Sequence, residues 1–179
     1  MTHHLTDYVL ALHGWAALAV VFAVPALEAS TFLGIVFPGE IAVLLGGVLA
    51  FEHRVSLAAV LVAAICGAVI GDTVGYAVGR RYGRRLLEGS LARLVKRRHL
   101  DRAERHLAER GGKAVLFGRF TAALRVLVPG LAGMSGMPYR RFAVYNVAGA
   151  VAWATETALL GYLGGSSWRH VERVASRVG

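Results

Sequence analysis

Two arginines inside an apolar stretch are the residues of this sequence with the clearest capacity for chemistry. Arg119 and Arg125 lie in the segment GRFTAALRVLVPGLAGMSGMP, residues 118–138. An arginine at the centre of a membrane costs roughly 2.5–3.5 kcal/mol on insertion scales, so each one needs a partner or a task. A guanidinium group matches the oxygens of a phosphate or of a carboxylate. The two residues therefore indicate either an anion-binding site or internal ion pairs.

Three acidic residues in other apolar stretches are the candidate partners of these arginines. Glu28 and Glu40 flank the sequence ASTFLGIVFPG, and Asp72 lies within a further apolar run. Glu40 follows a Pro-Gly turn and so lies near the start of a short helix, where the helix dipole favours the anionic carboxylate. The acids could pair with the arginines in a purely structural role. They could also release the arginines when they are protonated or when a phosphate displaces them.

The apolar stretches that carry these residues have the lengths of spanning helices and of shorter half-helices. Hydrophobic residues make up 56% of the 179 residues, and they fall in runs of about 20, the length that spans a bilayer. The stretches beside Pro38-Gly39 and Pro129-Gly130 are interrupted, so each is predicted to form a re-entrant hairpin that turns at the Pro-Gly. The predicted order is a spanning helix at 8–27, a re-entrant hairpin at 28–51, a spanning helix at 55–79, a basic amphipathic segment at 80–113, a second re-entrant hairpin at 114–138, a spanning helix at 142–164 and a tail at 165–179.

The sequence thus predicts a single all-α membrane domain with three spanning helices and two facing re-entrant hairpins. The two halves of the chain look alike, because Phe37-Pro38-Gly39 parallels Val128-Pro129-Gly130. A broken hairpin followed by a spanning helix, repeated, is typical of transporters with inverted repeats. Residues 80–113 hold 12 of the 20 basic residues, and such loops stay on the cytoplasmic side. We therefore expect the basic segment and the N-terminus in the cytoplasm, with the hairpins entering from opposite faces.

Several function classes are not expected from this composition. The chain has a formal charge of +9, but no aromatic platform or nucleic-acid fold accompanies the basic segment, so a nucleic-acid partner is not expected. Membrane phosphatases use histidines in defined motifs, and His53, His99 and His106 lie outside such motifs. We expect no catalytic residue, no metal site and no cofactor. Cys66 is the single cysteine, which excludes a disulfide framework.

Three pieces of the sequence together carry a family resemblance. They are Glu28 with Phe37-Pro38-Gly39-Glu40, the run GDTVGYAVGRRYG at 71–83, and the run FGRFTAALRVLVPGLAGMSGMPYRRFAVYNVAGAVAW at 117–153. With these residues the chain resembles the DedA family, also called the VTT-domain or SNARE-associated Golgi protein family. The resemblance covers about residues 28–164. Ala122 departs from it, because family members usually have a proline between the two arginines, and many have a further spanning helix after the segment that ends at Gly164.

The resemblance implies a role in moving lipids between the leaflets of the bacterial cytoplasmic membrane. It implies a polyprenyl phosphate or a phospholipid as the substrate and dependence on the proton motive force. Family members use a pair of arginines and a pair of acids, which correspond here to Arg119 and Arg125 and to Glu28 and Glu40. On this basis Arg119 and Arg125 are assigned to the phosphate head group and Glu28 and Glu40 to protons, while Asp72 and Arg80 match the family motif after the first hairpin. We add Asp72 to the proton carriers and Arg80 as a supporting residue. Glu156, within the last predicted span, could carry a proton or pair with an arginine, and it is a further supporting candidate.

The leading hypothesis is therefore a lipid flippase or scramblase with proton coupling and no enzymatic activity. Its partners are membrane lipids with an anionic phosphate, and the glycine-rich helix faces are compatible with a homodimer. Two alternatives stay open. One is a proton-coupled transporter of small ions or amphipathic drugs, and the other is a structural protein of membrane assembly in which the charges only pair with each other. The sequence leaves open which lipid moves and in which direction.

Overall fold

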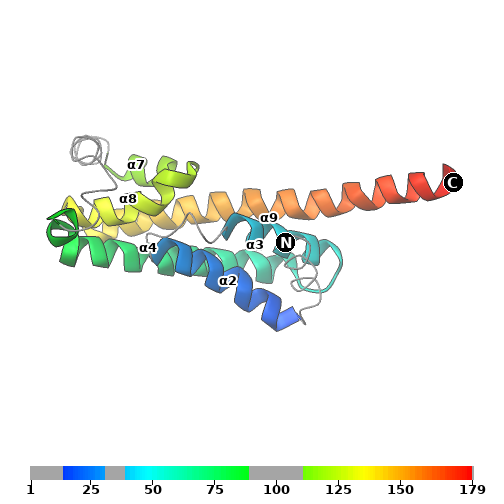
Figure 1. Cartoon of the computed structure of the whole chain (residues 1–179), viewed down its shortest axis with the longest axis horizontal. Helices are drawn as coiled ribbons and strands as arrows, with labels where there is room; N and C mark the ends of the chain where they lie inside the picture. The colour runs from blue at the N-terminus through cyan, green and yellow to red at the C-terminus, as the bar shows by residue number, and fades with distance from the viewer. Residues whose placement is uncertain (1–13, 31–38, 89–110, 179) are drawn as a thin grey trace.

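The computed structural model describes residues 14–30, 39–88 and 111–178, and the secondary structure in these ranges is helical. The helices are α2 (Gly14–Ser30), α3 (Gly39–Phe51), α4 (Leu57–Glu88), α7 (Gly112–Gly118), α8 (Ala122–Met134) and α9 (Tyr139–Val178). The long helices α4 and α9 run side by side, and the shorter helices pack along them (Figure 1). The C-terminal part of α9 extends past the other described helices (Figure 1). The all-α prediction is confirmed for the described residues.

One described helix is long and apolar enough to cross a membrane. It is the part of α4 from Leu57 to Gly83, with 27 residues, and it corresponds to the predicted span at 55–79. Among the described residues the apolar helical stretches Gly14–Glu28, Gly39–Phe51 and Leu124–Met134 are shorter. The predicted spans at 8–27 and 142–164 therefore stay predictions.

Glycines bring several pairs of helices into backbone contact. Gly47 of α3 and Gly161 of α9 each have the backbone of the other helix where a Cβ would lie. Gly79 of α4 and the backbone of Gly130 of α8 meet in the same way. Small residues permit such close approach of apolar helices. As a result α3, from the first half of the chain, packs on α9, and α8, from the second half, packs on α4.

Two clusters of buried apolar side chains form the core, and alanine is frequent in the first of them. The first cluster joins α2, α3, α4 and α9 and contains Val21, Val43, Ala50, Val60, Ala64, Ala68, Ala150, Trp153, Ala154 and Ala158. The second joins α4, α7, α8 and the start of α9 and contains Tyr76, Val115, Val128, Leu131, Ala132, Met137 and Phe142. Large apolar side chains also lie exposed, among them Val62, Val144, Leu160 and Leu163. Apolar surface of this kind fits contact with lipid.

The break in the second predicted hairpin lies at residues 119–121, so the predicted turn at Pro129-Gly130 is wrong. Thr121 is extended, with φ −119° and ψ 119°, and its carbonyl accepts the N–H groups of Leu124 and Arg125 at the start of α8. Helix α8 then continues through Pro129 to Met134. A proline is tolerated inside a membrane helix when neighbouring helices support the backbone, and here α4 packs against Gly130.

Other predicted boundaries also fall inside helices. Helix α2 continues past residue 27 to Ser30, α4 continues past residue 79 to Glu88, and α9 begins at Tyr139 and continues past Gly164 to Val178. Gly164 is not enough to end α9, because a glycine inside a helix costs only about 1 kcal/mol relative to alanine. The predicted turn at Pro38 and most of the predicted basic segment lie outside the described residues.

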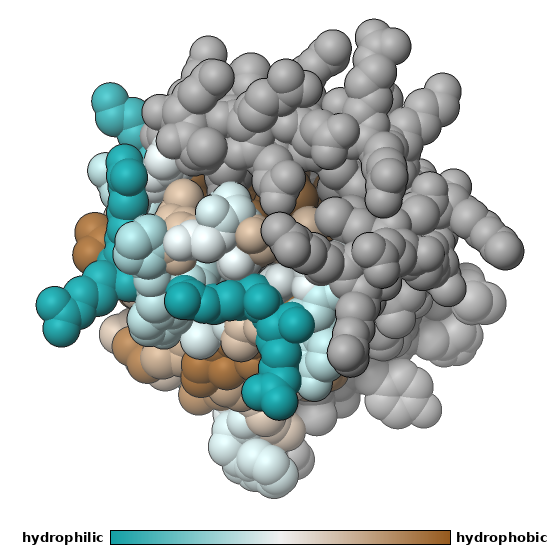
Figure 2. Space-filling view, turned by 90° about the vertical axis from the view of Figure 1, so that its left-hand side faces the viewer, coloured by the Kyte–Doolittle hydropathy of each residue, from teal (hydrophilic) through white to brown (hydrophobic). Residues whose placement is uncertain are grey.

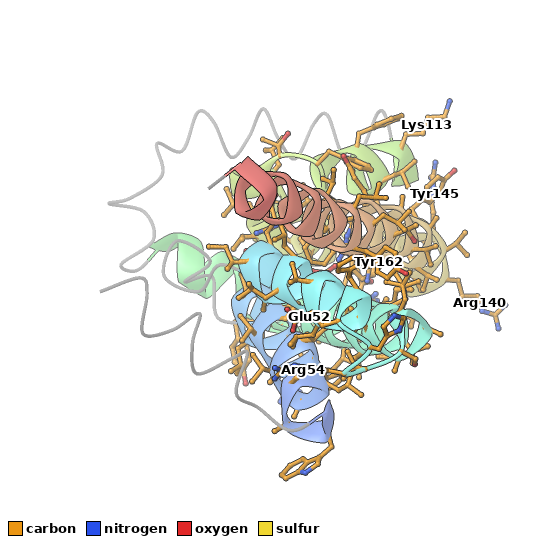
Figure 3. All side chains as sticks on the ribbon, turned by 90° about the vertical axis from the view of Figure 1, so that its right-hand side faces the viewer. Glu52, Arg54, Lys113, Arg140, Tyr145 and Tyr162 are labelled. Atoms are coloured by element: carbon orange, nitrogen blue, oxygen red, sulfur yellow. The ribbon has the colours of Figure 1, made fainter. Side chains whose placement is uncertain are left out.

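Basic side chains gather at the end of the bundle where α4 ends and α9 begins. Arg80, Arg81, Arg140 and Arg141 are exposed there, and hydrophilic side chains project from this end in Figure 2. Figure 3 shows Arg140, and also Lys113 at the start of α7, pointing away from the helices. Of these residues, Arg80, Arg81 and Lys113 belong to the basic segment 80–113 that the sequence predicts to be cytoplasmic.

Candidate functional site

Arg119 lies in the break between α7 and α8 and is buried among three helices. Its side chain is 8% exposed. Its Nη1 donates to the carboxylate of Asp72 on α4 and to the side-chain oxygen of Asn146 on α9. Asp72 is 3% and Asn146 is 1% exposed. The break after α7 thus places one guanidinium between the two long helices of the bundle.

Two donors of this cluster have no protein acceptor. Nε of Arg119 and Nδ2 of Asn146 are buried, and neither has a hydrogen-bond partner among the described residues. The orientation of the Asn146 amide follows from chemistry, because an arginine only donates and must face the amide oxygen. A buried donor without an acceptor is costly, and such groups in folded proteins call for an explanation.

Arg125 lies three residues into α8 and pairs with Glu28 near the end of α2. Its Nε and Nη2 donate to Oε1 of Glu28 at 3.0 and 2.6 Å. The other carboxylate oxygen of Glu28 accepts the backbone N–H of Gly39, the first residue of α3, at 2.8 Å. A carboxylate at a helix N-terminus is favoured by the helix dipole. Glu28 therefore ties together α2, α3 and α8.

Glu40 and Trp153 complete the surroundings of Arg125. Oε2 of Glu40 lies 3.8 Å from Nη1 of Arg125, and the Glu40 side chain is 61% exposed. The ring of Trp153 on α9 lies 5.4 Å from the guanidinium carbon of Arg125, within the range of a cation–π contact. An exposed, longer ion pair contributes little, so Glu28 is the dominant partner of Arg125 and Glu40 is the more accessible acid.

Two cavities meet at Arg119, Arg125 and Trp153. The first, which we call the Glu28 cavity, has a volume of about 20 Å³. The second, which we call the Glu40 cavity, has a volume of about 130 Å³. Besides the three shared residues, the Glu28 cavity is lined by Pro25, Glu28, Ala68, Asp72 and Val126. The Glu40 cavity is lined by Glu40, Phe120, Glu156, Thr157 and Leu160.

The structure therefore brings most of the predicted site residues to one place. The residues gathered there are Glu28, Glu40, Asp72, Arg119, Arg125 and Glu156. Arg80 is different, because it is exposed and donates to the hydroxyl of Tyr76 at 2.8 Å, and it lines neither cavity. The roles of these residues in binding and in proton transfer stay predictions.

Asn146 and Trp153 are the residues of this site that sequence reasoning did not assign. Asn146 is an amide within the apolar run of the predicted span at 142–164. Polar side chains within apolar helices commonly hydrogen-bond to neighbouring helices, so its position was a usable signal. Trp153 gave no such signal, since aromatic residues in apolar helices are frequent and only the packing of α8 on α9 places its ring beside Arg125.

Electrostatically the site consists of two compensated pairs. Arg119 with Asp72 and Arg125 with Glu28 each sum to no net charge, and both pairs are largely buried. A phosphate that entered either cavity would compete with these carboxylates for the same guanidinium donors. The arrangement can therefore exchange an internal anion for an external one.

Comparison with known proteins gives a family match and several relatives. Residues 37–163 match the model described as the VTT domain. An uncharacterized membrane protein of Synechocystis is 43% identical over 130 residues, which cover 72% of this chain and 60% of that protein. Protein DedA of Escherichia coli K12 is 34% identical over 82 residues, 46% of this chain and 37% of that protein. An uncharacterized membrane protein of Mycobacterium leprae is 40% identical over 162 residues, 87% of this chain and 76% of that protein.

The matched part of the chain spans 60% or less of the length of the Synechocystis and Escherichia coli relatives. No solved structure matches the chain.

Proposed function

Because this chain belongs to the DedA family of VTT-domain membrane proteins, we propose that it is a flippase or scramblase for lipids with a phosphate head group. The lipid moves between the leaflets without any bond in it being made or broken. The chemistry that would recognise the substrate is that of an oxyanion held by guanidinium groups. A polyprenyl phosphate and a phospholipid share this chemistry.

The observation that carries the proposal is the position of two buried arginines where two cavities meet. Arg119 and Arg125 line both the Glu28 cavity and the Glu40 cavity. Charges that serve only to join helices need no cavity beside them, and burying them is expensive. Two cavities that share both cations would let an anionic head group reach the same guanidinium groups from either side.

The acids of the site would exchange places with the phosphate. When a phosphate takes the donors of Arg125, the carboxylate of Glu28 loses its cation and becomes ready to accept a proton. Protonation also weakens its charge-assisted bond to Gly39 at the start of α3. Glu28, Glu40 and Asp72 would then carry protons with the passage of the lipid. This exchange would couple the two fluxes.

The packing of the helices supports a proposal on topology. Helix α3 packs on α9 and α8 packs on α4, so each half of the chain contributes a short helix to the long helix of the other half. Such reciprocal packing suits two re-entrant hairpins that enter from opposite faces. The exposed basic end of the bundle would lie in the cytoplasm, in line with the distribution of Lys and Arg, with the protein in the bacterial cytoplasmic membrane.

The test is a measurement of lipid movement in proteoliposomes. The accessibility of a fluorescent short-chain polyprenyl phosphate in the outer leaflet is followed with and without a pH gradient. Wild type is compared with Arg125→Ala, with Glu40→Gln and with the control Arg140→Gln, which removes an exposed arginine outside the site. We expect wild type and Arg140→Gln to move the lipid and Arg125→Ala to slow it by about tenfold or more, the size expected for a lost charge-assisted bond. We expect Glu40→Gln to abolish the response to the pH gradient.

Other results would point to the alternatives. If folded wild type moves no lipid, the flippase proposal fails, and a transporter of small ions or a role in assembly takes its place. If the lipid moves equally well in Arg125→Ala and Glu40→Gln, the charges only hold the helices together.

A further inference from the structure

The two arginines of the site differ in which of their donors are used. In Arg125 the edge formed by Nε and Nη2 is filled, because both atoms donate to Oε1 of Glu28. In Arg119 the atom Nη1 donates to Asp72 and to Asn146, whereas Nε is buried without a hydrogen-bond partner among the described residues. The Nε–Nη2 edge is the one that binds a carboxylate or a phosphate in a bidentate manner. Arg119 is therefore held through Nη1, and the Nε atom of this edge has no protein acceptor among the described residues.

We infer that Arg119 is the first of the two arginines to bind the phosphate, through its Nε–Nη2 edge, and that Asn146 is the positioning residue that holds it for this purpose. The inference rests on the proposed function and adds to it an order of binding and a residue. Arg125 engages the phosphate only afterwards, during the passage of the lipid, because it must first release Glu28.

The position of Asn146 explains why an amide is suited to this place. Asp72 on α4 and Asn146 on α9 hold the same nitrogen of Arg119 from two helices, which restrains the rotation of the guanidinium. A second carboxylate in place of the amide would also accept this bond, but its charge would repel an incoming phosphate. Asn146 orients Arg119 without adding a negative charge.

The unused atoms of the cluster indicate the chemical nature of the ligand. Nε of Arg119 and Nδ2 of Asn146 are both donors, and both are buried without an acceptor among the described residues. The two buried atoms that lack a partner are therefore both donors, while the Asp72 carboxylate is already paired with Arg119. A phosphate oxygen satisfies such donors, whereas a cationic ligand does not.

Arg125 is expected to contribute less to the initial binding. Its exchange of Glu28 for a phosphate replaces one oxyanion by another, so the net gain is small. Glu28 also holds Gly39 through its second oxygen at 2.8 Å, and this bond keeps the carboxylate in place. Replacement of Arg125 should therefore affect movement of the lipid more than its equilibrium binding.

The test is a titration of the protein in detergent micelles with a short-chain polyprenyl phosphate, with Trp153 as the reporter. Trp153 lines both cavities, and Trp15→Phe with Trp168→Phe leaves it as the single tryptophan of the chain. In this background the dissociation constant is measured for wild type, Arg119→Lys and Arg125→Lys. Lysine keeps the charge and removes the bidentate edge. We expect Arg119→Lys to weaken binding by about tenfold or more and Arg125→Lys by less than about threefold.

A double-mutant cycle separates positioning by Asn146 from a general structural effect. Asn146→Leu is measured alone and combined with Arg119→Lys, beside Phe142→Leu, which alters packing one turn away on the same helix without touching Arg119. We expect Asn146→Leu to weaken binding by about tenfold alone and by less than about twofold when Arg119 is already lysine, because it acts through the guanidinium. Phe142→Leu should have the same effect in both backgrounds.

The results distinguish failure of the inference on Arg119 and Asn146 from failure of the proposed function. If Arg125→Lys weakens binding more than Arg119→Lys does, or if Asn146→Leu costs the same in both backgrounds, the inference on Arg119 and Asn146 is overturned while the proposed function stands. If wild type does not bind the lipid at all, the proposed function fails and this inference fails with it.

Discussion

Removal of the Asp72 carboxylate should destabilise the fold by several kcal/mol, because it leaves Arg119 as an uncompensated buried charge. Both side chains are more than nine-tenths buried, and the one other protein partner of the guanidinium within the described residues is the neutral Asn146. Breaking a buried ion pair by removing one partner typically costs 3–5 kcal/mol. We expect Asp72→Ala to lower the free energy of unfolding by about 3–5 kcal/mol.

A matched control comes from an exposed ion pair of the same chain. Glu52 and Arg54 approach to 3.2 Å, but their side chains are 27% and 50% exposed, and they lie beside each other at the surface in Figure 3. An exposed pair contributes about 0–1 kcal/mol, so Glu52→Ala should lower the stability by no more than that.

The double variant Asp72→Ala with Arg119→Leu shows whether the cost comes from the unpaired charge. Replacing both members of a buried pair by apolar side chains is often neutral or stabilising. We therefore expect the double variant to be more stable than Asp72→Ala alone, by roughly 2–4 kcal/mol.

The assay is equilibrium unfolding in mixed micelles, followed by the helical circular dichroism signal. An Asp72→Ala variant that loses no more stability than Glu52→Ala would show that Arg119 is not an uncompensated buried charge. A double variant that is less stable than Asp72→Ala would show the same, since Arg119 would then stabilise the fold without its carboxylate.

Three further predictions use the same unfolding assay. Glu28→Gln should lower the free energy of unfolding by about 2–4 kcal/mol, because Glu28 is a buried partner of Arg125. Glu40→Gln should lower it by less than about 1 kcal/mol, because Glu40 is exposed. Equal losses would contradict the assignment of Glu28 as the dominant partner. Gly79→Ala should lower the stability by about 1–3 kcal/mol, because its Cβ would meet the backbone of Gly130. Gly164→Ala has nothing within 4 Å of its Cβ and should raise the stability by about 0.5–1 kcal/mol. A neutral Gly79→Ala would contradict the close approach of α4 and α8. Ala122→Pro should leave the stability unchanged or raise it by about 0.4–1 kcal/mol, because Ala122 is the first residue of α8 and Thr121 is already extended. Leu127→Pro, in the helix interior, should lower the stability by about 3 kcal/mol or more. A large loss of stability in Ala122→Pro would show that α8 begins elsewhere.

Much of the site could be predicted from the sequence because burial of a charge in an apolar chain has a cost that composition alone reveals. Arg119, Arg125, Glu28 and Asp72 stand out in apolar stretches, and such residues must find partners. The helical class follows from the same apolar runs. The resemblance to the DedA family is confirmed by the family match and by the relatives.

The position of the break in the second hairpin could not be predicted, since local propensity and tertiary packing disagree there. A Pro-Gly pair is a strong turn signal in isolation, and the prediction followed it. In the structure the backbone of Gly130 packs on Gly79 of α4, and α8 passes through Pro129 while the chain breaks at residues 119–121. The contact that overrides the turn signal lies far away in the sequence.

The sequence by itself determined that the arginines and the acids of this protein must meet, whereas the tertiary structure decided which acid each arginine takes. Arg119 pairs with Asp72, 47 residues away, and Arg125 pairs with Glu28, 97 residues away. Spacing along the chain cannot specify such pairs, because they depend on which faces of α4, α8 and α9 the glycines bring together. The same packing places Asn146 beside Arg119, and it leaves the Nε–Nη2 edge of Arg125 filled by Glu28 and the Nε atom of Arg119 without a protein acceptor among the described residues.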